Sequence, residues 1–379
     1  MSGRIVYLND GEMGVITGGG ASALTSQRMA QYQRTLRQLE EQHAWKTSGA
    51  GAQFMGQTNP YAGADTQGEA CRVTALTSLR GQLLYALSTP EMGGLYLKDP
   101  LDDEAQEGNW YSDRGFFVRD MDAHDGQIAL ALDTVRGECH IALMEEGRPS
   151  YRVITQGDTV DAAPWLSRRE RDVLYYASVG NGRNEDGVIL AQGPSAILRL
   201  HLVSGELTEL MADDRTDYLR PREAPDGALY FIRRPYQQKG NRPLSLGEKV
   251  KNVGAFLRGV GMFFRAIADP KGAANSKPVL SGGAKAVHQS RTLEGQMLDV
   301  SLPADPAEQD KGCVPDSWVL MRRDADGTLA EVVRGVADYA FDGDALVYSD
   351  GRRIFRLRDG RKEKLCQGIF LSRVAVLEG

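Results

Sequence analysis

The sequence predicts an all-β protein built from repeated four-stranded antiparallel units. One complete unit spans 336–368, where short apolar runs alternate with Asp-Gly dipeptides at 342–343, 350–351 and 359–360. Asp-Gly between apolar runs is the strongest short-range signal for a β-hairpin. The same combination of a turn followed by an apolar strand recurs along the chain, and each end of the chain supplies part of a further unit.

The complete unit contains four expected strands. They lie at 338–341, 345–349, 354–357 and 364–366. Because each pair is joined by a short turn, consecutive strands should lie side by side as an antiparallel meander. This unit is the template against which the other segments are compared.

The turn and the strand that follows it recur at a regular spacing. They occur at Gly81, Gly126, Arg171, Gly227 and Gly343, and the first two steps are each 45 residues. The next two steps, of 56 and 116 residues, are longer because they contain a Gly/Asn-rich loop at 180–193 and a segment at about 238–312. A repeat of this length is typical of propellers and solenoids.

The two ends of the chain complete each other. Segment 370–377 has the pattern of a first strand without successors, whereas 4–8 has that of a second strand without a predecessor. Pairing them would finish one unit from both ends and close a ring, which removes exposed sheet edges. The sequence thus predicts one domain over 1–379: a six-bladed β-propeller of four-stranded antiparallel blades, closed by its terminal strands and carrying two helical insertions.

Three hairpin segments resemble a known family. AHDGQIALAL (123–132), APDGALYFIRR (224–234) and AFDGDALVYS (340–349) resemble the hairpin between the first and second strands of TolB-like six-bladed propellers. The likeness to WD40-like propellers is weaker because their Gly-His and Trp-Asp signatures are missing. The TolB-like resemblance implies a fold and leaves activity open, since propellers serve as scaffolds, binders, hydrolases and lyases.

Composition is that of an ordinary globular protein. The 379 residues are 41% hydrophobic and 25% charged, with a net charge of −6, so no general attraction to nucleic acid is expected. The sequence shows no secretory signal and no apolar run long enough to span a membrane, which predicts a cytoplasmic protein. Its cysteines are isolated from one another and are expected to be reduced thiols.

The first insertion, at 21–47, predicts an amphipathic helix over 25–45. Its apolar stripe contains Met29, Tyr32, Leu36, Leu39 and His43. Thr25 or Ser26 is suited to cap its N-terminus. We expect the apolar face to pack on the propeller, since a coiled coil with a partner needs more heptads.

The second insertion, at 238–312, is locally basic. Positions 237–278 hold eight basic and two acidic residues. Apolar residues at helical spacing predict a basic amphipathic helix at about 246–268, followed by a flexible Gly/Ala/Ser-rich tether at 272–286. The residues expected to contact a partner or a membrane are Lys249, Lys251, Phe256, Leu257, Arg258, Phe263, Phe264 and Arg265.

Three surfaces could cover the apolar face of this helix. The propeller itself is the commonest use of such a stripe. An anionic membrane surface would suit aromatic residues opposite Lys and Arg. A groove on a protein partner is the third alternative.

Motifs for metal binding or nucleophilic catalysis are absent from the sequence. There is no CxxC, HxH, HExxH or G-x-S-x-G, so we expect no metal site and no cofactor. The charged residues expected on the channel-lining strands are Arg72, Arg119, Asp120, Asp161, Arg220, Arg222, Asp338 and Arg373. Such arginines could bind an anionic ligand or a peptide carboxylate, or these charges could form salt bridges with one another.

These observations favour a non-catalytic binding or scaffold propeller. A protein partner would contact the inserted helix or the propeller face, with peripheral contact to an anionic membrane as a further option. The alternative is a lactonase- or lyase-like propeller enzyme that acts on an anionic small molecule in the central channel. The sequence gives no indication of the oligomeric state.

Overall fold

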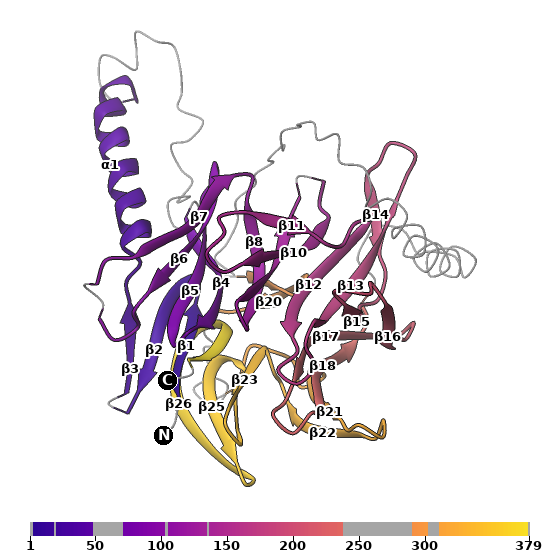
Figure 1. Ribbon diagram of the computed structural model, residues 1–379. Coiled ribbons are helices and arrows are strands. Elements are labelled where there is room, and N and C mark those ends of the chain that lie inside the picture. The colour runs from indigo at the N-terminus through magenta and orange to yellow at the C-terminus, as the bar shows by residue number, and fades with distance from the viewer. Residues whose placement is uncertain are drawn as a thin grey trace.

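A computed structural model describes residues 3–18, 20–47, 71–102, 105–134, 136–237, 290–301 and 311–377. Within these ranges the protein is built mainly of antiparallel strands, with one helix (Figure 1). The strands form consecutive meanders, and the sheets curl around a common centre. Among the described residues, no helix is both long and apolar enough to cross a membrane.

The two terminal segments pair with each other, as the sequence predicted. β1 (Arg4–Asn9) is antiparallel to β26 (Arg361–Leu377), in a register that runs from Arg4 opposite Leu377 to Asn9 opposite Leu371. β2 (Glu12–Thr17) and β3 (Gly20–Leu24) continue this sheet outward. The N and C marks lie close together in Figure 1.

The next two units are also meanders. The first contains β4 (Arg72–Leu79), β5 (Gln82–Ser88), β6 (Met92–Lys98) and β7 (Gly108–Arg114). The second contains β8 (Phe117–His124), β9 (Gln127–Asp133), β10 (Cys139–Glu145) and β11 (Tyr151–Val153).

Two further units follow in the same order. The first contains β12 (Thr159–Leu166), β13 (Val173–Arg183), β15 (Ala196–His201) and β16 (Leu207–Met211), with β14 (Ile189–Gln192) paired to the long end of β13. The second contains β17 (Thr216–Glu223), β18 (Leu229–Pro235), β21 (Val319–Arg323) and β22 (Leu329–Arg334).

The template unit has the predicted strand order. It contains β23 (Asp338–Asp342), β24 (Ala345–Ser349), β25 (Gly351–Arg358) and the first part of β26. The sequence predicted separate strands at 364–366 and 370–377, whereas the structure has one continuous strand of 17 residues. β26 therefore belongs to two units, pairing with β25 through its first part and with β1 through its second.

The tight hairpin turns explain the repeated glycines. At Arg80-Gly81 the φ angles are 52° and 75°, and at Asp125-Gly126 they are 47° and 75°. Two consecutive positive φ angles define the type I′ turn, whose twist matches that of the flanking strands. Glycine at the second position adopts this conformation without steric cost.

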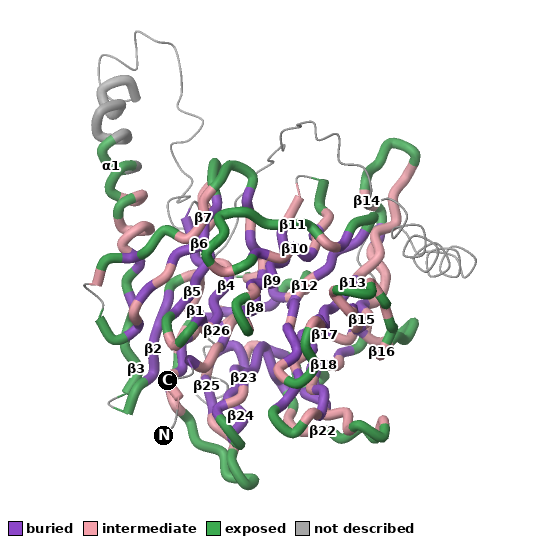
Figure 2. Tube along the Cα trace, viewed as in Figure 1, coloured by how far each residue is buried: buried purple, intermediate pink, exposed green. Residues whose placement is uncertain are grey.

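The core lies between neighbouring units rather than on one side of a single sheet. All five residues of 83–87 are buried, although their side chains alternate between the two faces of β5. Both faces must therefore be covered, which explains why these strands are continuous apolar runs. In Figure 2 the buried segments lie in the strands near the centre, and the outer loops are exposed.

Helix α1 (Gln27–Thr47) is attached to the sheets through its first turns. Met29 and Tyr32 pack against the core formed by β1, β2, β4 and β5. The Ser26 hydroxyl accepts a hydrogen bond from the Met29 amide at 3.1 Å, and Glu107 accepts bonds from the amides of Gln27 and Arg28 at 3.0 and 3.1 Å. Figure 1 shows the rest of α1 projecting away from the strands. The predicted packing thus holds for Met29 and Tyr32, while the side chains of Leu36, Leu39 and His43 lie outside the described set.

The second insertion contributes a hairpin to the core, which the sequence did not predict. β19 (Ser290–Leu293) and β20 (Gln296–Asp299) pair with each other, and Leu293, Leu298 and Val300 are buried in one cluster with Trp318 and Tyr339. The predicted helix at 246–268, with its proposed contacts from Lys249 to Arg265, lies outside the described residues. The predicted insertion at 238–312 therefore includes a hairpin that belongs to the core of the propeller-like fold.

Replacing Leu298 tests how much this hairpin stabilises the fold. Leu298→Ala removes a side chain that is 3% exposed, and we expect the free energy of unfolding to fall by about 2–5 kcal/mol. The neighbouring Met297 is 73% exposed, so Met297→Ala is the matched control and should change stability little. Urea denaturation measures both variants. Equal stability of the two would show that the hairpin does not contribute to the core.

Candidate functional site

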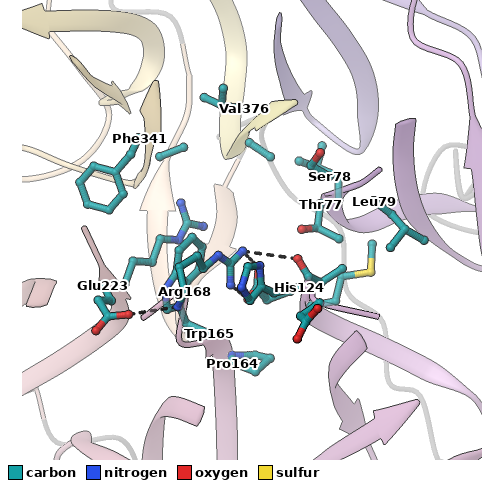
Figure 3. A pocket seen from close by; sticks show the side chains of 18 of the residues that line it. Thr77, Ser78, Leu79, His124, Pro164, Trp165, Arg168, Glu223, Phe341 and Val376 are labelled. Carbon is teal, nitrogen blue, oxygen red and sulfur yellow. Dashed lines mark hydrogen bonds and ion pairs between the residues drawn. The ribbon is translucent and has the colours of Figure 1, made fainter. Parts of the chain in front are cut away.

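The first strands of all the units line one cavity of about 1050 Å³. Its walls come from residues 76–79 of β4, 120–124 of β8, 163–165 of β12, 220–223 of β17, 340–341 of β23 and 374–376 of β26, together with adjoining turns. Figure 3 shows Trp165 and Arg168 on one side, with Phe341, Val376 and Ser78 around the remaining walls. The volume is at the upper end of the range usual for ligand pockets.

Two bulges shape the walls. The register of β12 shifts between Ala162 and Trp165, and that of β17 shifts between Leu219 and Arg222. Ala163 and Arg220 have positive φ angles of 50° and 53°, and each precedes a proline. Such backbone costs about 1–3 kcal/mol per residue and is held by its surroundings. A bulge redirects the side chains that follow it, and Trp165 and Arg222 both line the cavity.

Arg220 is one of the residues that line the cavity, and its side chain is 2% exposed. Its Nη1 is 2.6 Å from Asp120 Oδ2 and 2.9 Å from Glu294 Oε1, and its Nε donates to Asp338 Oδ1 at 2.7 Å. These partners come from β8, the turn of the β19–β20 hairpin and β23. One guanidinium therefore joins three segments that are far apart in the sequence.

Two more arginines join this cluster of ion pairs, which we call the floor network. Arg373 lies 3.5 Å from Asp120 and 3.3 Å from Glu294, and Arg222 Nη2 lies 3.2 Å from Asp338 Oδ1. The floor network thus contains Arg220, Arg222 and Arg373 with Asp120, Asp338 and Glu294. Three positive and three negative charges cancel, which permits their burial.

Burial and ion pairing shift the pKa values of the floor network in opposite directions. Burial raises the pKa of Asp120, but Arg220, Arg373 and Arg222 outweigh it and lower the pKa below the usual value. Burial likewise raises the pKa of Glu294, and Arg373 and Arg220 bring it below its usual 4.5. Burial lowers the pKa of Arg220, yet Asp120, Asp338 and Glu294 raise it well above normal. These side chains are therefore all charged at neutral pH.

The wall beside the floor network is formed by an aromatic ring between arginines. The Arg168 guanidinium lies 3.9 Å from the centroid of Trp165 and binds both oxygens of Asp122 at 2.5 and 2.8 Å. Glu223 accepts hydrogen bonds from the Ser167 hydroxyl at 2.6 Å and from the Arg168 amide at 3.1 Å. The carboxylates of this wall already have donors.

Arg222 is held mainly by aromatic faces. Its guanidinium carbon lies 5.5 Å from the Trp165 centroid and 5.1 Å from the Tyr339 centroid. Tyr339 is fully buried, and its hydroxyl donates to the carbonyl of Arg220 at 2.7 Å. Arg222 therefore lies within cation–π range of two rings, and the hydrogen bond of Tyr339 holds one of them in place.

The structure brings together five of the eight channel candidates: Asp120, Arg220, Arg222, Asp338 and Arg373. The remaining three, Arg72, Arg119 and Asp161, lie outside the floor network, and of the eight candidates Asp120, Arg220 and Arg222 line the cavity. Arg72 is exposed at the start of β4, Arg119 pairs with Asp133 at 2.6 Å, and Asp161 accepts a hydrogen bond from Ser178 at 2.6 Å. Alternate residues of a strand face opposite sides, so a charge on a channel strand need not face the channel.

The sequence left open whether the channel charges bind an anionic ligand or form salt bridges with one another. In the structure, the charges of the floor network form salt bridges with one another. Four further residues of the site were not predicted from the sequence: Glu294, Trp165, Arg168 and Asp122. For Glu294 the only signal was the Glu294-Gly295 turn between two short apolar runs. Among the described residues, no group of three or more His, Cys, Asp or Glu side chains is arranged to hold a metal ion.

Removing the charge of Glu294 should destabilise the protein. Glu294→Gln leaves the buried Arg220 and Arg373 with one carboxylate fewer, and we expect a loss of about 3–5 kcal/mol at pH 7. Glu331→Gln is the control, because Glu331 pairs with Arg233 and Arg334 at the exposed surface and should matter little. Chemical denaturation compares the variants. A loss no larger than that of Glu331→Gln would contradict a structural role for the floor network.

The same carboxylate predicts a pH dependence. Since the pKa of Glu294 is lower in the folded protein than its usual 4.5, its stabilisation is complete above about pH 4.5 and is lost as the pH falls through the folded value. The stability difference between the wild type and Glu294→Gln should therefore shrink in acid. Denaturation at pH 7, 5, 4 and 3 measures it. A constant difference over this series would argue against the lowered pKa.

Comparisons with known proteins find solved structures whose overall arrangement is similar to that of this chain. No protein-family model and no curated protein matches the chain. Similar solved structures include TolB from Acinetobacter baumannii (12% identity, TM-score 0.47, 99% of this chain and 66% of that one) and a putative TolB from Agrobacterium tumefaciens (14%, 0.41, 78% and 83%).

A puromycin hydrolase mutant is also similar (13% identity, TM-score 0.33, 76% of this chain and 36% of that one). The chain spans just under two thirds of the first TolB structure. The chain thus resembles TolB-like propellers, as its hairpins do. None of these TM-scores reaches 0.5, and no residue role or activity transfers to this chain from them.

Proposed function

We propose that this chain is a closed six-bladed β-propeller that binds an extended segment of a protein partner in its central cavity, without catalysis. The observation that carries the proposal is that the first strands of all the units line one cavity, above a floor of mutually neutralised charges. The partner segment would enter this cavity. The basic helix predicted at 246–268 stays a prediction, as does its contact with a partner or an anionic membrane.

Contacts between first strands support a closed ring. β4 contacts β8, β8 contacts β12, and β12 contacts β17. β23 contacts β26, and β26 contacts β4. Between β17 and β23, the bond from Arg220 to Asp338 supplies the remaining link. Together with the pairing of β1 and β26, these contacts follow the order expected of six blades around an axis.

The state of the cavity carboxylates supports binding over catalysis. A general base works best with a pKa near the operating pH. Asp120 has a lowered pKa, and Asp122 is held through both oxygens by Arg168. A lactonase- or lyase-like mechanism would have to remove such a carboxylate from its arginine. The polar groups of these walls instead hold the architecture in place.

The composition of the lining supports a peptide ligand. Trp165, Phe341 and Val376 offer apolar surface, while the carboxylates of Asp120, Asp122 and Glu223 around them are already paired. A pocket that combines apolar surface with fixed polar groups suits ligands that have both characters. An extended peptide segment presents such side chains alternately to either side.

Peptide selection tests the proposal. Random peptides displayed on phage are selected against the full chain and then measured with Ser78→Trp, which places a large ring in the cavity wall. We expect selected peptides to lose binding to Ser78→Trp. Ser204→Trp is the matched control, because Ser204 is exposed in the turn between β15 and β16 and should leave binding unchanged. Peptides that bind all three proteins equally would overturn the proposal.

A further inference from the structure

We infer that Arg222 anchors a carboxylate of the bound segment, and that the cavity selects ligands with a single carboxylate beside an apolar group. This inference rests on the proposed function and specifies the chemistry of the same cavity. The carboxylate could be a free C-terminus or an Asp or Glu side chain. Both present the same planar pair of oxygens to a guanidinium.

Most N–H donors of Arg222 are not used within the described part of the chain. A guanidinium carries five N–H donors. Among the described residues, Arg222 makes one ion pair, at 3.2 Å to Asp338 Oδ1, and no hydrogen bond of good geometry. That oxygen already accepts a bond from Arg220 Nε at 2.7 Å. Arg220 and Arg168, by contrast, each donate several bonds.

Two aromatic rings restrict the position of Arg222, although most of its N–H donors make no hydrogen bond among the described residues. Trp165 and Tyr339 lie within cation–π range of the guanidinium, and such contacts do not use its N–H donors, which stay available for a bidentate contact. Its side chain is 13% exposed and lines the cavity. A ligand would therefore meet an arginine that has already lost much of its freedom, which lowers the entropic cost of binding.

The surroundings restrict the ligand to one negative charge. Asp122 is neutralised by Arg168, and Asp120 by Arg220 and Arg373, so an incoming carboxylate does not face an unpaired one there. The floor network has no net charge, and Arg222 lines the cavity with N–H donors that no hydrogen bond among the described residues uses. Phe341 and Val376 lie on the walls of the same cavity and would contact an apolar neighbour of the carboxylate.

Small probes test this chemistry directly. Ligand-observed NMR titrations of the full chain at pH 7 compare 4-phenylbutyrate with 4-phenylbutanamide, which differ only in the carboxylate. We expect the carboxylate to bind about tenfold more tightly or better, as a charge-assisted contact should. Arg222→Gln should remove this preference. Equal binding of the two probes to the wild type, or no saturable binding of the carboxylate, would overturn the inference.

Two further variants separate recognition from folding. Arg119→Gln is the matched control, since Arg119 pairs with Asp133 outside the cavity, and the preference should survive. Arg222→Lys keeps the charge and loses the planar fork, so it should retain only part of the preference. If Arg222→Gln retains the full preference, or if Arg119→Gln loses it as well, Arg222 is not the anchor.

Peptides distinguish the two carboxylate sources. The probes are acetyl-Gly-Ser-Ala-Leu-Phe with a free C-terminus, its C-terminal amide, and the amide with Glu in place of Ala. Tighter binding of the first or the third than of the neutral amide, sensitive to Arg222→Gln, supports the inference and names the source. Equal binding of all three, with sensitivity to Ser78→Trp, overturns the inference and leaves the proposed function standing. Selected peptides insensitive to Ser78→Trp would instead overturn the proposed function.

Discussion

The ion pairs around Arg220 join the parts of this structure that the chain itself keeps apart. Asp120, Asp338 and Glu294 come from β8, β23 and the β19–β20 hairpin, and each lies within 2.9 Å of the Arg220 guanidinium. Burying such charges is favourable only when every partner is present, because an unpaired buried charge is costly. The left-handed backbone at Arg220 is part of the same requirement, since it places the side chain where all three carboxylates meet.

The fold could be predicted largely from turns and apolar periodicity. The template unit and the pairing of 4–8 with 370–377 follow from Asp-Gly turns and short apolar runs, which are local signals. The β19–β20 hairpin could not be predicted with the same ease. It lies in a segment whose charge and glycine content indicated an insertion, and its role depends on contacts with Trp318 and Tyr339 from other units.

The candidate site could be predicted only in part, because the direction of a side chain depends on bulges. Asp120 and Arg119 are neighbours on β8, yet one joins the floor network and the other pairs with Asp133. The register of β8 also shifts between Val118 and Asp120, which a pattern of residue types does not reveal. Trp165 carried no such charge signal, although its ring contacts both Arg168 and Arg222.

The continuity of β26 has a consequence for how the molecule assembles. Residues 371–377 supply the hydrogen-bond partner of β1, so the edge of β1 stays open until this segment, more than 360 residues further along the chain, has been made. Contacts between such distant residues form slowly, and open edges invite pairing with other chains. When β26 pairs with β1, it covers the open edge of that strand. The same strand pairs with β25, so one segment completes both units.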